Sequence, residues 1–178
     1  VDYLKRKKEK IDFCIVGEPT NPNKLGEMIK IGRRGSISGT IMISGSQGHV
    51  AYPHLSNNPI NTLVKICKKL NEKKLDKGNR NFQPSNLEFT SINVDNKAAN
   101  VIPASAKAQF NIRFNNLHTS NSLKKKINSV VKNLSKKNKC KFKIDFHVSG
   151  ESFLTKPNKT IYLARNIIKR VTKISPVF

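Results

Sequence analysis

The chain is organised around the stretch Ser36-Ile37-Ser38-Gly39-Thr40-Ile41-Met42-Ile43-Ser44, which leads through Gly45 into Ser46-Gln47-Gly48-His49-Val50-Ala51-Tyr52-Pro53-His54. Apolar and small residues alternate in the first part, which predicts a strand with one buried face. That face is made of Ile37, Ile41 and Ile43. The second part predicts a loop, because its glycines free the backbone and Pro53 stiffens the exit. His49 is therefore displayed by a loop, and on the residues alone a solvated histidine is the simpler interpretation.

Two amphipathic helices are predicted further along the chain. The first follows Asn58, a capping residue, with Pro59 in its first turn. Its apolar residues, spaced three and four apart, are Ile60, Leu63, Val64, Cys67 and Leu70. The second follows Thr119 or Ser120 and is expected to bury Leu123, Ile127, Val130, Val131 and Leu134.

Three more strands alternate with these helices. In residues 86–94 strict alternation would put Leu87 and Phe89 on the face opposite Ile92 and Val94, which predicts a bulge near Ser91. Residues 106–114 and 140–148 alternate without a break. Their inward residues are Ala106, Ala108, Phe110, Ile112 and Phe114, then Cys140, Phe142, Ile144, Phe146 and Val148. The resulting order, βαββαβ, predicts an α+β, ferredoxin-like domain with two helices on one face of a four-stranded sheet.

The two ends of the chain have a different pattern. Ile11–Val16 is a nearly continuous apolar run, which predicts a strand buried on both faces, as in an α/β domain. Glu18 follows it, at the strand end where such domains place ligands and metals. Residues 27–31 predict a further strand, and Gly32–Gly35 a turn with two arginines. Residues 157–173 predict an amphipathic helix that buries Ile161, Ala164, Ile167, Ile168 and Val171.

The composition is strongly basic, with 34 Lys+Arg against 11 Asp+Glu and a net charge of +23. Because the lysines are spread over several predicted elements, we attribute the charge to composition rather than to a nucleic-acid partner. An RNA-recognition module remains the rival from another class, although its exposed aromatic residues on the third strand are not predicted here. Cys14, Cys67 and Cys140 are expected to be core residues in a reducing compartment. With no membrane-spanning run, we expect a soluble, cytoplasmic protein.

Several motifs resemble those of the succinyl-diaminopimelate desuccinylases, which are two-zinc amidohydrolases of the aminoacylase/carboxypeptidase family. Gly48-His49-Val50-Ala51-Tyr52-Pro53-His54 is similar to the signature of their lid, or dimerisation, domain. Val16-Gly17-Glu18-Pro19 resembles the motif of a carboxylate metal ligand, which implies that role for Glu18. Gly32-Arg33-Arg34-Gly35-Ser36 resembles a substrate-binding motif. It implies that Arg33 holds a substrate carboxylate beside Ser36, with Arg34 as the alternative.

The same resemblance assigns residues in the lid. Asn100-Val101-Ile102-Pro103 matches a motif whose amide holds substrate, although Ala99 stands where close relatives often have a second Asn. Ile112-Arg113-Phe114 is similar to a strand end whose arginine binds a substrate carboxylate. His49 is implied to reach from the lid of one subunit into the active site of the other and to donate to the oxyanion.

The resemblance also implies an organisation and an activity. Residues 1–31 and 151–178 are expected to be pieces of an α/β catalytic domain, and residues 32–150 the lid; the chain would then be an internal piece of a longer protein. That protein would be a homodimer that hydrolyses N-succinyl-LL-2,6-diaminopimelate to succinate and LL-2,6-diaminopimelate in lysine biosynthesis. It would use two Zn²⁺ ions, or Co²⁺, for which this piece supplies only Glu18 and so is expected to be inactive alone. A related aminoacylase or peptidase is the alternative activity.

Overall fold

The computed structural model describes residues 2–18, 20–72 and 74–178. They form two compact units, one of residues 32–155 and one that joins residues 1–31 to residues 156–178.

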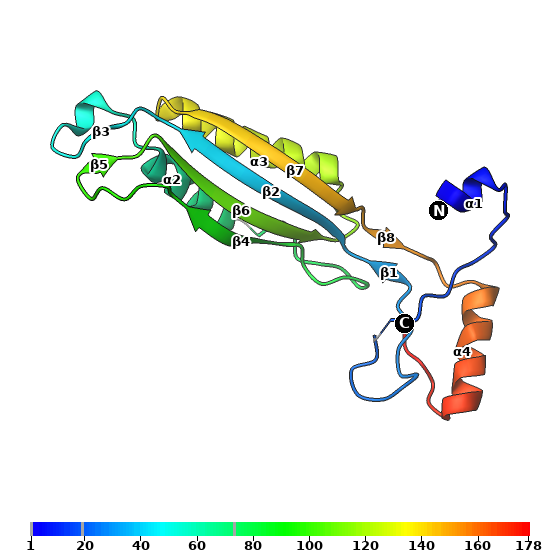
Figure 1. The fold of residues 1–178 in the computed structure, drawn as a ribbon. Coiled ribbons are helices and arrows are strands. Elements are labelled where there is room, and N and C mark those ends of the chain that lie inside the picture. The colour runs from blue at the N-terminus through cyan, green and yellow to red at the C-terminus, as the bar shows by residue number, and fades with distance from the viewer. Residues whose placement is uncertain (1, 19, 73) are drawn as a thin grey trace. The chain divides into compact units, whose positions relative to one another are not determined.

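The larger unit is the predicted α+β, ferredoxin-like domain. Its elements are β1 (Gly32–Arg33), β2 (Gly35–Ser44), β3 (Gly48–His49), a 3-10 turn η1 (Pro53–Leu55), α2 (Pro59–Asn71), β4 (Asn86–Asn93), β5 (Val101–Ile102), β6 (Ser105–Phe114), α3 (Ser120–Lys137), β7 (Lys141–Gly150) and β8 (Phe153–Leu154). The main sheet is antiparallel with the strand order β4-β6-β2-β7, and α2 and α3 pack on one face of it (Figure 1). The predicted βαββαβ order is therefore confirmed.

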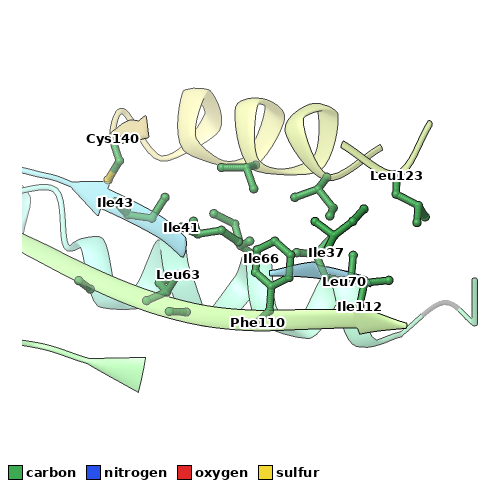
Figure 2. Close-up of a cluster of buried hydrophobic side chains, with 14 of the residues drawn as sticks. Ile37, Ile41, Ile43, Leu63, Ile66, Leu70, Phe110, Ile112, Leu123 and Cys140 are labelled. Atoms are coloured by element: carbon green, nitrogen blue, oxygen red, sulfur yellow. The ribbon is translucent and has the colours of Figure 1, made fainter. Parts of the chain in front are cut away.

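The core lies between this sheet and the two helices. The isoleucines of β2 and the inward residues of β6 are buried as predicted. Phe110 projects from β6 toward the helices (Figure 2) and fills the space that a side chain at Gly39, its partner in the ladder, would occupy. It also meets Phe89 and Phe146 edge-on, with ring centroids 6.1 and 6.2 Å away. These contacts join β4, β6, β2 and β7 into one core.

The predicted bulge in β4 is confirmed, because the pairing of β4 with β6 shifts between Phe89 and Ser91. Beyond the shift, Ile92 lies opposite the buried Ala108. Residues opposite each other in a ladder share a face of the sheet. The bulge thus brings Ile92 to the helix-covered face, the same face as Phe89.

Both helices begin where the sequence predicts. Asn58 caps α2 by accepting from the Ile60 N–H at 2.9 Å, and Thr119 forms a capping box with Ser122 at α3. The predicted burial of Val64 was wrong: it is exposed, and Ile66 is buried in its place. Both residues fit a three-and-four spacing, so the packing of α3 against α2 decided which face is covered.

The smaller unit contains α1 (Asp2–Arg6) and α4 (Lys159–Thr172), which begins two residues after the predicted start at 157 and is capped by Asn158. Its predicted burial was wrong for Ile167 and Val171, which are exposed. The predicted strand 27–31 is reduced to a single parallel bridge, Met28 to Val177. Gly32–Arg33, predicted as part of a turn, pairs instead with β8 as strand β1.

Ile11–Val16 is the largest departure from prediction. These residues form no strand, and Ile11, Phe13, Ile15 and Val16 are exposed, as is Cys14, which was predicted to lie in a core. A strand buried on both faces needs neighbouring strands for its backbone and covering layers for its side chains. Within the described ranges, no other segment pairs with it, so its apolar composition alone cannot make it a strand.

Candidate functional site

The predicted site residues of the larger unit fall into two groups at opposite ends of β2. Ser36 is near the start of the strand, paired with Arg113 and close to Arg33 in the chain. His49 and Asn100 belong to the segments beyond its far end, past Ser44. From Ser36 to Ser44 there are eight steps of ~3.3 Å, so the groups are roughly 26 Å apart.

The structure brings His49 and Asn100 together at the far end. His49 lies opposite Val101 in the short β3–β5 ladder, and the Val50 N–H donates to the Asn100 carbonyl at 3.0 Å. The Asn96 side chain holds the β5 segment by donating to the Val101 carbonyl at 2.8 Å. Two segments that are 51 positions apart in the sequence, at His49 and Asn100, therefore lie together at one small ladder.

The orientation of the His49 ring is set by its own loop. Its Nδ1 accepts from the Ala51 N–H at 3.1 Å, and the ring lies 6.0 Å from that of Tyr52. A neutral imidazole that accepts at Nδ1 carries its proton on Nε2. His49 is exposed, and in this tautomer its Nε2–H is a hydrogen-bond donor.

Two glycines let this loop lie against the start of α2. A Cβ at Gly45 would collide with the Asn57 carbonyl, and one at Gly48 would lie 2.8 Å from the Ser56 Cβ. The Ser46 Oγ adds a hydrogen bond from the Asn57 N–H at 2.8 Å. The sequence predicted that these glycines free the backbone. Neither has a positive φ, however, and close approach of the two segments is what requires them.

At the near end of β2 the structure distinguishes the two arginines. The Arg34 guanidinium donates to the Pro84 carbonyl and to the Asn86 Oδ1, both at 3.2 Å. The Arg33 guanidinium lies over Gly150, since a Cβ there would be 2.5 Å from the Arg33 Nη2. Gly150 is the ladder partner of Ser36, so Arg33 lies beside Ser36 as the motif implied.

Ser36 and Arg113 complete this end. Ser36 is buried, and its Oγ accepts from the Asn111 side chain at 3.3 Å. Arg113 is exposed on the sheet face that the helices leave open, since it shares that face with Ser36. Two guanidinium groups are therefore displayed near one strand end, an arrangement suited to a ligand with carboxylates.

Glu18 belongs to the smaller unit and is exposed in the segment that follows Val16. Pro19, the last residue of its motif, lies outside the described residues. Across the described parts of both units, no group of three or more His, Cys, Asp or Glu side chains could hold a metal ion. The residues present here therefore do not fit a complete two-metal site.

Sequence reasoning missed a buried polar cluster around Asp76. The Asp76 carboxylate accepts from the Gly78 N–H at 2.6 Å, the Ser85 N–H at 3.2 Å and the Asn115 side chain at 2.8 Å. Burial alone would raise the pKa of Asp76, but these hydrogen bonds outweigh it and lower the pKa to about 2. The Asp-Lys-Gly sequence signals a local turn at Asp76, whereas the contact with Asn115 has no sequence signal.

A sequence family described as the peptidase dimerisation domain, M20_dimer, matches residues 31–152, more than half of the chain. The chain belongs to this M20 dimerisation family. The M20 dimerisation domain therefore includes the whole βαββαβ unit, with the β3 loop that carries His49. This membership agrees with the resemblance of the lid motifs.

Curated relatives extend the similarity to the whole chain. It is 63% identical to the succinyl-diaminopimelate desuccinylase of Pelagibacter ubique, over 99% of this chain and 46% of the relative. It is 47% identical to the protein of the same name from Parvibaculum lavamentivorans, over 99% of this chain and 45% of the relative. The chain thus spans a little less than half the length of these relatives.

Solved structures share the fold. An aminopeptidase, PepT, from Bacillus cereus superposes with a TM-score of 0.69 at 12% identity, covering 85% of this chain and 39% of the aminopeptidase. A dinuclear metal-binding peptidase of the M20 family from Bacillus subtilis superposes with a TM-score of 0.60 at 14% identity, covering 84% of this chain and 36% of the peptidase. At these identities the likeness concerns the fold.

Two further observations bear on rival functions. Both phenylalanines of the third main-sheet strand, Phe110 and Phe114, are buried, so β6 does not present the stacking aromatic residues of an RNA-recognition sheet. In the described ranges, none of the helices has the length and apolar character needed to cross a bilayer.

Proposed function

We propose that this chain is the central part of a longer desuccinylase that hydrolyses the amide of N-succinyl-LL-2,6-diaminopimelate to succinate and LL-2,6-diaminopimelate, a step of lysine biosynthesis. The family membership, the relatives that share its sequence and the paired motif residues support this proposal. Residues 1–31 and 151–178 then belong to the catalytic domain, and residues 32–150 form the lid. The free cysteines fit a reducing compartment such as the cytoplasm.

The separation of the two site groups carries the mechanistic part of the proposal. Arg33 and His49 lie at opposite ends of a strand that is roughly 26 Å long from Ser36 to Ser44. Within a single chain, these two residues are too far apart to contact the same small substrate. In a two-fold dimer, each active site receives Arg33 and Arg113 from one subunit and His49 and Asn100 from the other.

In this arrangement each side chain has a distinct role. Arg33 and Arg113 pair with substrate carboxylates, Ser36 fixes the backbone beside them, and the Asn100 amide orients the succinyl amide. As water attacks the amide carbon, negative charge develops on the carbonyl oxygen of the amide. The Nε2–H of His49, left as the donor because Nδ1 accepts from Ala51, donates a hydrogen bond to that oxygen and stabilises the transition state.

The two Zn²⁺ ions of this proposal, or Co²⁺ in their place, need ligands that the described residues do not provide. Glu18 is the ligand that the motif Val16-Gly17-Glu18-Pro19 assigns. The remaining ligands and the general base are assigned to parts of the longer protein outside this sequence. Metal content of the longer protein, measured with Glu18→Ala as the comparison, tests the assignment.

The dimer requires a surface that fits its own copy, and the flank formed by α2 and β4 has that character. Lys65 donates to Asn138 at the end of α3, which marks the side of α2 that faces α3. At 100° per residue, Val64 lies on the flank away from α3. Val64 is 55% exposed, and Ile92 on edge strand β4 is 57% exposed. We call Val64 and Ile92, with the half-buried Ile60 and Cys67 of α2, the α2–β4 surface.

The opposite edge of the sheet is less suited to self-association. Edge strand β7 carries exposed Lys141, Lys143 and Asp145, and the adjoining helix α3 ends in Lys136 and Lys137. Charged residues on an edge strand oppose pairing with another copy. The α2–β4 surface is therefore the proposed dimer interface.

The role of His49 is tested in the longer enzyme by the substitution His49→Ala. Loss of one oxyanion donor lowers kcat by about 10²–10³. His54→Ala is the matched control, because His54 lies in the adjacent 3-10 turn η1 and has no assigned role. Equal effects of the two substitutions on kcat, in folded dimers, would reject the proposed role.

A further inference from the structure

The loop between α2 and β4 is anchored by a charged group with almost no access to solvent. The Asp76 side chain is 8% exposed and binds the backbone of Gly78 and Ser85, which lie on opposite arms of this loop. The His118 Nε2 lies 3.2 Å from its other oxygen. One carboxylate thus joins both arms of the loop, whose residues 76–86 we call the clamp loop.

Asn115 attaches the clamp loop to the end of β6. Its side chain is fully buried and donates to Asp76 and to the Gln83 carbonyl, at 2.8 and 3.2 Å. Its backbone N–H donates to the Ser85 Oγ at 2.9 Å. Buried polar groups joined in this way fix the relative positions of the segments that carry them. The clamp loop is therefore held to the main sheet.

The far part of the clamp loop lies on the β1–β8 ribbon. The Phe82 ring reaches Gly32, where a Cβ would be 3.1 Å from the Phe82 Cζ. The Arg34 guanidinium ties the chain just after β1 to Pro84 and Asn86. Because β1 pairs with β8 over two residues only, Gly32 with Leu154 and Arg33 with Phe153, the ribbon has few hydrogen bonds of its own. Contacts with the clamp loop are therefore expected to contribute to the rigidity of the β1–β8 ribbon.

We propose that Asp76 is a positioning residue: it acts through the clamp loop to hold the β1–β8 ribbon, and with it the backbone that carries Arg33. Asp76 and Phe82 touch no substrate in this proposal. The ribbon part of this proposal, the effect of Asp76 on the β1–β8 ribbon, rests on the contacts of the clamp loop with Gly32 and Arg34. The substrate part, the effect on substrate binding, rests on the proposed function of Arg33.

The ribbon part is tested by backbone ¹⁵N relaxation of the 178-residue chain. Asp76→Asn should make residues 32, 33, 153 and 154 mobile, with order parameters falling from about 0.85 toward 0.6, while β6 stays rigid. Phe82→Ala removes the ribbon contact and leaves the Asp76 cluster intact, so it covers the case in which Asp76→Asn does not fold. Asp145→Asn, an exposed site with the same charge change, is the control. Unchanged ribbon order parameters in folded Phe82→Ala would overturn the proposal.

The substrate part is tested by steady-state kinetics in the longer enzyme. Phe82→Ala should raise KM for the succinylated substrate about tenfold and change kcat little, because it weakens ground-state and transition-state binding equally. Asp145→Asn should leave both unchanged. If Arg33→Ala leaves KM unchanged, the proposed function of Arg33 fails while the relaxation result still decides the ribbon part. If Arg33→Ala raises KM and Phe82→Ala does not, positioning by the clamp loop is rejected.

Discussion

Removing apolar area from the α2–β4 surface should weaken a dimer without weakening the fold. Val64 is 55% exposed, so Val64→Ser removes little from the core. Full burial of a valine is worth about 1.5–3 kcal/mol, so covering its exposed half contributes about 1 kcal/mol. A two-fold interface contains the residue twice. The loss of about 2 kcal/mol raises the dimer Kd about 30-fold.

The dimer Kd is measurable by sedimentation velocity over a concentration series of the 178-residue chain. Ile92 has a similar exposure, so adding Ile92→Ser should bring the total loss of dimerisation free energy to about 4 kcal/mol. This loss corresponds to an increase in Kd of about 1,000-fold. Leu117→Ser is the matched control, because Leu117 is 56% exposed but lies in the connection between β6 and α3.

The α2–β4 interface would be refuted by a dimer whose Kd is the same for the wild type and the double variant. It would equally be refuted if Leu117→Ser weakened the dimer as much as Val64→Ser. Thermal unfolding of each variant at low concentration shows whether a change in Kd comes from the interface or from the fold.

Two other predictions concern single side chains. Because the folded pKa of Asp76 is about 2, below its usual 3.8, its carboxylate stabilises the fold above pH 4 and loses that effect as the pH falls toward 2. The loss is about 2 kcal/mol, and urea unfolding between pH 5 and pH 2 should show it in the wild type but not in Asp76→Asn. Gly150→Ala should push the flexible end of Arg33 aside, raising KM in the longer enzyme about threefold to tenfold with an unchanged melting temperature; an unchanged KM would contradict the position of Arg33.

The sequence predicted the lid well because its elements have clear periods. Strict alternation in β6 and an alternation broken once in β4 were enough to predict the buried face and the bulge. Helix α2 shows what periodicity leaves undetermined. Val64 and Ile66 both fit an apolar stripe, and only the position of α3 determines which of them is covered.

The predictions that were wrong or missing concern contacts that periodicity does not encode. Ile11–Val16 has the composition of a buried strand, but a strand forms only beside another, and in the described ranges no segment pairs with it. Asp76 and Asn115 are 39 positions apart, and nothing in either local sequence indicates that they meet. The Gly32–Ser36 motif, by contrast, implied that Arg33 lies beside Ser36, which is where the structure has it, whereas the proximity of His49 to Asn100 was found only in the structure.

The proposal that His49 acts in the active site of the partner subunit is tested most directly by mixing two impaired variants of the longer enzyme, assayed at substrate concentrations well below KM. His49→Ala and Arg33→Ala each damage every site of their own homodimers. After subunit exchange, a mixed dimer has one site with both defects and one with neither, so an equal mixture should regain about a quarter of wild-type activity. If mixed dimers form and activity stays at the level of the separate variants, His49 and Arg33 serve the same subunit's site and the account is wrong.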